Sequence, residues 1–144
     1  MKILGKLLIT ISILAYTVIP PIVDLSTETH VLHDGWLPHA RMHTVWLLGV
    51  TSGIGLLALY LLWSHGPDHK GQVNLSVFLS AIVFSAFYLS ALTMPLYGGA
   101  LTDMEGGVGQ GPFGIDGNMF TFTVATALLL VGWILSSRGT KQQG

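Results

Sequence analysis

The chain has 144 residues, of which 51% are hydrophobic and only 9% are charged, and its formal net charge is −1. A soluble domain usually has about a quarter of its residues charged, so this composition argues against a soluble enzyme, and the lack of a basic block in the sequence argues against a nucleic-acid partner. The chain contains no cysteine, which excludes disulfide bonds and thiolate metal sites.

Four apolar segments are long enough to cross a membrane, at about residues 3–23, 39–63, 75–95 and 119–137. A span needs roughly 20 residues, because each helical residue rises 1.5 Å and the hydrocarbon layer is about 30 Å thick. Backbone groups in lipid must form their hydrogen bonds internally, and the short alternating segments of a membrane barrel are not seen. The sequence therefore predicts an all-α integral membrane four-helix bundle with a single domain over residues 1–144.

The first segment begins like a signal peptide. It has no small-x-small cleavage site before Pro20 and Pro21, so we expect it to be retained as the first span. We expect the helix to end at this proline pair, because proline cannot continue a helical hydrogen-bond ladder without a kink.

The polar loop 24–41 and the turn after it hold an unusual cluster, with four of the six histidines within fourteen residues. Pro38 suits the first turn of a helix, so we expect the second helix to begin there, which places His39 and His43 on one helix face. Neutral imidazoles beside carboxylates suit copper, iron or zinc. The predicted ligands of a transition metal are His30, His39, His43 and Glu28. Further ligands, or groups that orient the rings from behind, are expected among His33, Asp24, Asp34, Asp103 and Glu105.

The same residues have an explanation without metal. Histidine, tryptophan and arginine gather at membrane interfaces because one end of each can be wet and the other apolar, and Trp36, Trp46 and Arg41 fit such a belt. Haem is not expected. A haem in a bundle needs histidines that face each other from two helices, and the other three segments contain none.

The remainder of the chain gives weaker signals. Gly49 and Gly53 form a small-xxx-small pair, which predicts close packing of the second helix against a neighbour. The third segment is expected to end at Met94-Pro95. The glycine-rich loop 96–118 is expected to fold over the first loop and to bring its acids near the histidines.

The charges predict an orientation. Five of the six basic residues lie at the two termini and in the loop 64–74, whereas six of the seven acids lie in the other two loops. By the positive-inside rule both termini face the cytoplasm, and the histidine loop faces the periplasm of a bacterial inner membrane. The five basic residues are Lys2, Lys6, Lys70, Arg138 and Lys141.

The stretch Glu28-Thr29-His30, followed by Trp36-x-Pro38-His39-Ala40-Arg41-x-His43, resembles the first loop of a family of small bacterial four-helix membrane proteins of unknown function. That loop reads roughly Glu-Thr-His, then Trp-Pro-Pro-His-Ala-Lys/Arg-Phe-His; Leu37 and His33 depart from it. The resemblance implies that His30, His39 and His43 are the core set, with Glu28 beside them, and it supplies no activity.

The spacing His30-x12-His43 is also similar to the two-histidine part of a copper site in the membrane C subunit of particulate methane and ammonia monooxygenases. Ser26 stands where that pattern has an aspartate. We take this likeness as a suggestion of metal chemistry and not as homology.

These observations favour a membrane metalloprotein with its site at the non-cytoplasmic face, such as an oxidoreductase acting on a lipophilic substrate. The alternative is a non-catalytic accessory subunit of a larger membrane complex, or of a homo-oligomer, whose loops contact a partner. A third hypothesis uses the histidines as proton-transfer groups without metal, because imidazole titrates near neutral pH.

Overall fold

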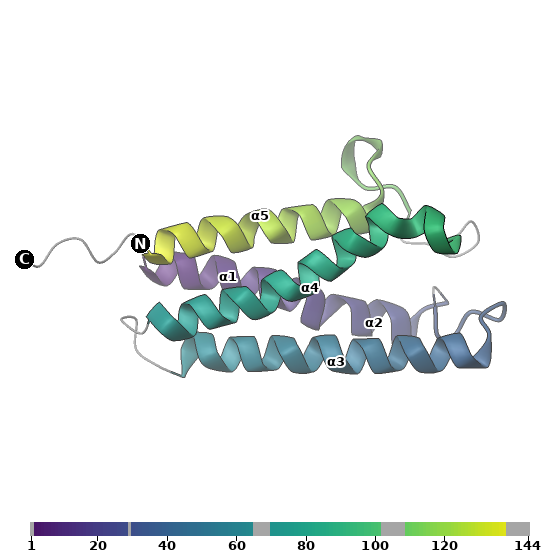
Figure 1. The fold of residues 1–144 in the computed structure, drawn as a ribbon, viewed down its shortest axis with the longest axis horizontal. Helices are drawn as coiled ribbons and strands as arrows, with labels where there is room; N and C mark the ends of the chain where they lie inside the picture. Colours follow the sequence, from purple (N-terminus) through teal and green to yellow (C-terminus); the bar gives the residue numbers. More distant parts are fainter. Residues whose placement is uncertain (1, 29, 65–69, 102–108, 138–144) are drawn as a thin grey trace, which may run out of the picture.

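The computed structural model describes residues 2–28, 30–64, 70–101 and 109–137. These residues form a bundle of long helices, which confirms the predicted all-α class (Figure 1). The elements are α1 (Lys2–Thr17), α2 (Ile19–Ser26), α3 (Pro38–Trp63), α4 (Lys70–Tyr97), the short 3-10 helix η1 (Pro112–Gly114) and α5 (Gly117–Ser137).

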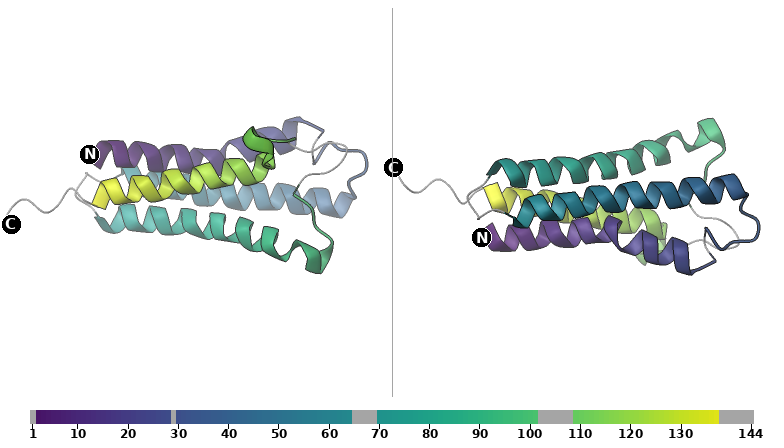
Figure 2. Two further views of the ribbon diagram at one scale, coloured as in Figure 1. Left: turned by 90° about the horizontal axis from the view of Figure 1, so that it is seen from above. Right: turned by 90° about the horizontal axis from the view of Figure 1, so that it is seen from below.

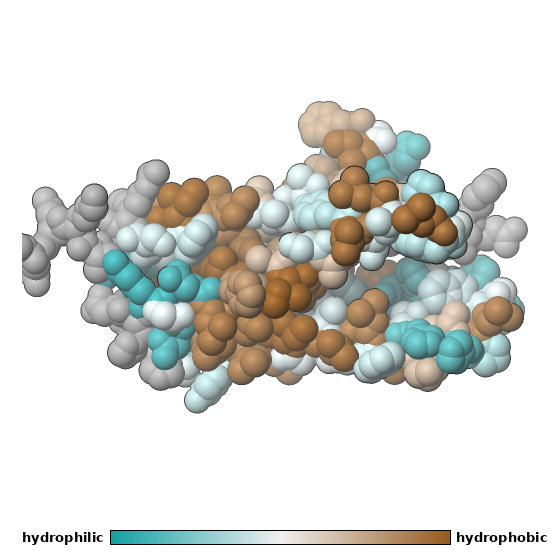
Figure 3. Space-filling view, viewed as in Figure 1, coloured by the Kyte–Doolittle hydropathy of each residue, from teal (hydrophilic) through white to brown (hydrophobic). Residues whose placement is uncertain are grey.

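Four helical stretches among the described residues are long and apolar enough to cross a membrane, and α1 and α2 together form the first of them. Many large apolar side chains on these helices point outward, among them Leu56 and Leu92, which are 63% and 80% exposed. In the space-filling view, apolar residues occupy the middle of the visible face, and the most hydrophilic residues gather toward its two ends (Figure 3). An apolar exterior of this kind suits contact with lipid.

The helices are arranged in a ring. α1 packs against α5 and α3, and α4 packs against α3 and α5. Successive long helices run in opposite directions, so α1 and α4 begin at the same end of the bundle at which α5 ends (Figures 1 and 2). α4 runs close to α3 near this end and diverges from it toward the other end (Figure 1).

The interior is apolar but contains hydrogen bonds between helices. Ile9, Ile13 and Leu129 are almost completely buried. Ser12 Oγ donates to the carbonyl of Ala125 over 2.7 Å, and the hydroxyls of Tyr16 and Ser80 lie 3.1 Å apart. Small and polar residues commonly join helices in this way within membranes.

The first predicted helix end was placed too early. The chain kinks at Val18, and α2 then continues to Ser26 with prolines in its first turn. This is possible because the first turn of a helix does not need the N–H groups that proline lacks.

The third predicted span, 75–95, is longer in the structure at both ends. α4 starts at Lys70 and includes Pro95 in its last turn. The helix then stops at Gly98, which has a φ of 69°, and the N–H of Gly99 bonds the carbonyl of Met94 over 3.0 Å. This is the glycine-dependent helix end known as a Schellman motif.

The expected packing of Gly49 and Gly53 was wrong. A Cβ added at either position would meet no other atom within 4 Å, because both glycines lie on the exposed face of α3. The close approach is made by Gly55 instead, where an added Cβ would overlap the side chain of Thr17.

Candidate functional site

His39 and His43 lie together on the first turns of α3, as predicted. The helix begins at Pro38, after Leu37 in an extended conformation. The two Nε2 atoms are 3.0 Å apart, and the rings meet edge to face with centroids 4.5 Å apart. Both side chains are exposed. At this distance the two rings share a hydrogen bond, in which the tautomers decide which ring donates.

His30 belongs to a different pair. Its Nδ1 atom lies 2.8 Å from Oδ1 of Asp24, which is carried by α2. Trp36 packs edge to face on the His30 ring, with centroids 4.9 Å apart. The side chains of His30 and Asp24 are 32% and 17% exposed, so this pair lies at the boundary between solvent and the bundle interior.

The path of the loop between these two pairs is set by Arg41. Its guanidinium donates to the backbone carbonyl of His33 over 2.8 Å and to that of Trp36 over 3.1 Å. Two donors of one rigid group therefore fix the turn to the start of α3. His33 itself accepts a hydrogen bond at Nδ1 from the N–H of Gly35, so its side chain stabilises the turn.

The predicted three-histidine centre is not assembled in the part of the chain that the structure describes. No group of three or more histidines or acids in this part is close enough to hold a metal ion. Glu28 and Asp34 are exposed. Asp103 and Glu105, and the predicted contact of their loop with the histidines, lie outside the described residues.

A cavity of about 310 Å³ lies between the helices at the Asp24–His30 pair. Most of its lining is apolar and comes from every long helix. Asp24 and His30 are the ionisable groups of the described lining besides Tyr16. Other lining residues are Leu47, Thr51, Phe87, Asn118 and Phe122.

Ring stacking and hydrogen bonds hold the aromatic and polar residues of the cavity wall in place. The rings of Phe87 and Phe122 stack at a centroid distance of 3.9 Å. The side-chain amide of Asn118 donates to the carbonyl of Leu101 over 3.0 Å. Asp116 caps α5, because its Oδ1 accepts from the N–H groups of Asn118 and Met119. The cap holds Asn118 at the cavity wall.

Sequence reasoning did not find Thr51, Phe87 and Asn118, because they come from three different helices with no shared motif. A local signal existed only for the start of α5, where Asp-Gly-Asn before an apolar run is typical of a helix start.

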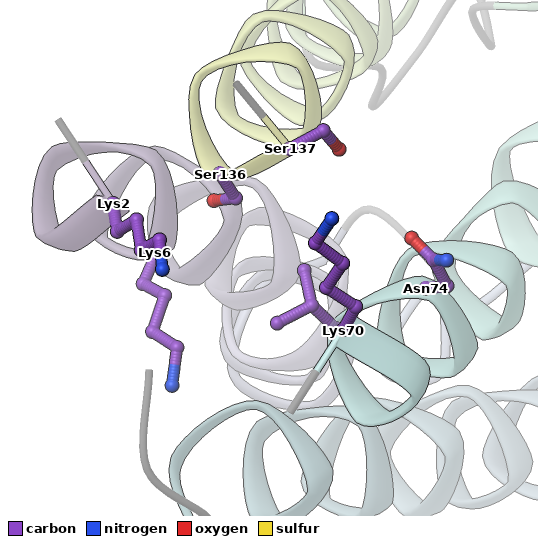
Figure 4. Close-up of a pocket in the computed structure, with 7 residues that line it drawn as sticks. Lys2, Lys6, Lys70, Asn74, Ser136 and Ser137 are labelled. Atoms are coloured by element: carbon purple, nitrogen blue, oxygen red, sulfur yellow. The ribbon is translucent and has the colours of Figure 1, made fainter. Parts of the chain in front are cut away.

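A smaller pocket of about 50 Å³ lies at the opposite end of the bundle (Figure 4). Lysines of α1 and α4 and serines of α5 line it. It contains none of the predicted site residues.

Comparisons with family models, with curated proteins and with solved structures find no match for this chain. The resemblance of its histidine loop to a family of small bacterial four-helix membrane proteins therefore stays a prediction.

Proposed function

We propose that this chain is an integral membrane protein that binds a small lipophilic molecule in the cavity beside Asp24 and His30. The observation that carries the proposal is the cavity itself, about 310 Å³ of largely apolar space with one carboxylate–imidazole pair in its lining. Pockets for small molecules have volumes of about 300–1,000 Å³ and combine apolar walls with a few placed polar groups. In a membrane, such a molecule would reach the cavity from the bilayer.

The Asp24–His30 pair would bind a hydroxyl or similar group of that molecule. Asp24 Oδ1 lies 2.8 Å from His30 Nδ1, within ion-pair distance but without hydrogen-bond geometry at Nδ1. Because a carboxylate can only accept, a small turn of the ring would form the bond, and this would place a proton on Nδ1. Nε2 is then left with a lone pair, which can accept a proton or a hydrogen bond. This is the arrangement in which an acid orients a histidine for general base chemistry.

The proposed orientation follows the distribution of charge in the sequence. We propose that the cavity end and the histidine loop face the periplasm of a bacterial inner membrane, with both termini in the cytoplasm.

A metal ion at His39 and His43 is the second candidate function, and the 3.0 Å between their Nε2 atoms favours it. The two Nε2 atoms would be the ligands, once an ion replaces the proton that they share. Imidazole nitrogen suits copper(II) and zinc. The remaining positions would be open to water or substrate.

The two candidate functions can belong to one protein. Helix geometry puts residues four apart on one face, so the row His39, His43, Leu47, Thr51 runs along α3 from its start into the cavity lining. A redox metal at the start of this row would suit an oxidoreductase with a lipophilic substrate.

Blocking the cavity tests the proposal. We expect purified protein in detergent to bind the fluorescent apolar alcohol 2-naphthol. In Thr51→Phe the new ring would fill the cavity and weaken binding by about tenfold or more, a change of about 1.4 kcal/mol. The Thr51 hydroxyl bonds carbonyls of its own helix, so its loss should cost little stability.

Thr93→Phe is the matched control. Its hydroxyl also bonds carbonyls of its own helix, on an exposed face of α4, and this variant should bind the probe normally. Equal binding by wild type and Thr51→Phe would show that the probe does not occupy the cavity, and would favour an accessory subunit without a ligand.

A further inference from the structure

The pocket at the other end of the bundle has a lining unlike that of the cavity. Two helix starts and one helix end meet there, and the described lining contains Lys2, Lys6, Lys70, Asn74, Ser136 and Ser137, together with Val73 (Figure 4). No acidic side chain occurs in this described lining. The pocket therefore combines positive charge with hydroxyl and amide groups.

The lysines have different roles in it. Lys6 is buried and its Nζ donates to the carbonyl of Leu62 over 2.7 Å, which joins α1 to the end of α3. Lys70 extends from α4 toward Ser136 and Ser137 of α5 (Figure 4). Lys2 contributes a further ammonium from the start of α1. Two charges from different helices thus border the same small space.

The other polar groups can donate hydrogen bonds as well. Oδ1 of Asn74 accepts a hydrogen bond from Trp133 Nε1 over 2.9 Å, so its NH2 group remains the donating part of the amide. Ser137 Oγ donates its hydrogen to the carbonyl of Trp133 over 2.8 Å, so it offers only its lone pairs. Ser136 Oγ is buried without a hydrogen-bond partner among the described residues, so its hydroxyl is the one that can donate. A site with ammonium, hydroxyl and amide donors and no carboxylate selects an anion.

The size of the pocket points to a phosphate group. The pocket has about 50 Å³ of space, far less than the volume of about 300 Å³ or more of pockets that enclose a whole small molecule. It can therefore enclose a compact group such as a phosphate, and the remainder of a larger anion would lie outside.

We propose that this pocket binds the phosphate group of an anionic phospholipid. It lies where three spans begin or end, which is the level of the headgroups in a membrane, and basic pockets between membrane helices are typical sites for such lipids. Exposed apolar residues of α1, Ile3, Leu4 and Leu7, are available beside it for the acyl chains. The inference rests on the proposed membrane insertion but not on the proposed ligand of the cavity.

The test uses purified full-length protein in a neutral detergent and short-chain lipids as probes. We expect dioctanoyl phosphatidylglycerol to raise Tm, whereas dioctanoyl phosphatidylcholine, which has the same chains and a zwitterionic headgroup, has a much smaller effect. Lys2→Gln/Lys70→Gln should weaken the phosphatidylglycerol effect by about tenfold in apparent affinity. Lys70→Gln alone serves if the double variant does not fold.

Arg41→Gln is the charge-matched control for Lys70→Gln, because it also removes one positive charge, at the start of α3 and at the opposite end of the bundle. Its response to phosphatidylglycerol, measured against its own Tm without lipid, should equal that of wild type. Equal stabilisation by the two lipids, or an unchanged response in both lysine variants, would overturn the site. Equal stabilisation by inorganic phosphate at the same concentration would overturn the assignment to lipid.

Discussion

Ser52 Oγ on α3 donates a hydrogen bond of 3.0 Å to the carbonyl oxygen of Thr17, the last residue of α1. In an uninterrupted helix this carbonyl would accept from the residue four positions on, which is Pro21 and has no N–H. The serine thus replaces the bond that the proline removes. It also fixes the point from which α2 carries Asp24 to the cavity.

Replacement of this serine should destabilise the bundle. Ser52→Ala leaves the Thr17 carbonyl without the donor that Ser52 supplies, and we expect the free energy of unfolding to fall by about 1 kcal/mol. Denaturation of the purified protein in mixed micelles measures it. Thr93→Ala removes a hydroxyl whose hydrogen bond is exposed and lies within its own helix, and its stability should stay within about 0.5 kcal/mol of wild type. Equal effects of the two variants would contradict the role of Ser52.

Gly55 and Gly53 provide a sharper comparison on the same helix. In Gly55→Ala the new methyl group would overlap the Thr17 side chain, so α1 and α3 must separate and stability should fall by about 1–3 kcal/mol. In Gly53→Ala the methyl group meets open space, and stability should be unchanged or higher by up to about 1 kcal/mol. The same denaturation assay applies. A larger loss of stability in Gly53→Ala than in Gly55→Ala would support the packing role predicted from the Gly49–Gly53 spacing.

The parts of this fold that depend on local sequence were predictable. Apolar length predicted four helical stretches long enough to cross a membrane, and Pro38 predicted the start of α3, which places His39 and His43 on one face. The pairing of His30 with Asp24 was not predictable from spacing, because the loop path depends on the bonds from Arg41 to two backbone carbonyls. The cavity depends on the packing of all the long helices, which no single segment encodes.

Metal binding can be tested separately from the cavity. If His39 and His43 form a two-histidine site, each alanine variant should lose most of the copper(II) bound by wild type in a calorimetric titration. The double variant should lose little more, because the two ligands act together. His33→Ala is the control, since its ring accepts a bond within the turn. Equal loss in His30→Ala would contradict a site of two histidines and support the three-histidine centre.

The orientation has its own test. Five of the six basic residues lie at the termini and in the loop 64–74, so the C-terminus should face the cytoplasm. A reporter that works only in the cytoplasm should therefore be active when it is fused after Gly144. Activity of a periplasmic reporter at the same position would contradict the proposed orientation, whatever the ligand.

Two matched probes test whether the Asp24–His30 pair binds the polar group of a lipophilic molecule in the cavity. Wild type should bind 2-naphthol more tightly than naphthalene, which has the same ring system without the hydroxyl. His30→Ala and Asp24→Asn should bind the two probes about equally, because the hydroxyl loses a hydrogen bond worth about 0.5–1.5 kcal/mol.

His33→Ala and Asp34→Asn, matched changes outside the cavity lining, should keep the wild-type preference. The direct measurement is therefore the ratio of the two dissociation constants in wild type and in His30→Ala. The ratio should be about threefold to tenfold in wild type and should fall to about one in His30→Ala. An unchanged ratio in His30→Ala would contradict binding of the hydroxyl by this pair.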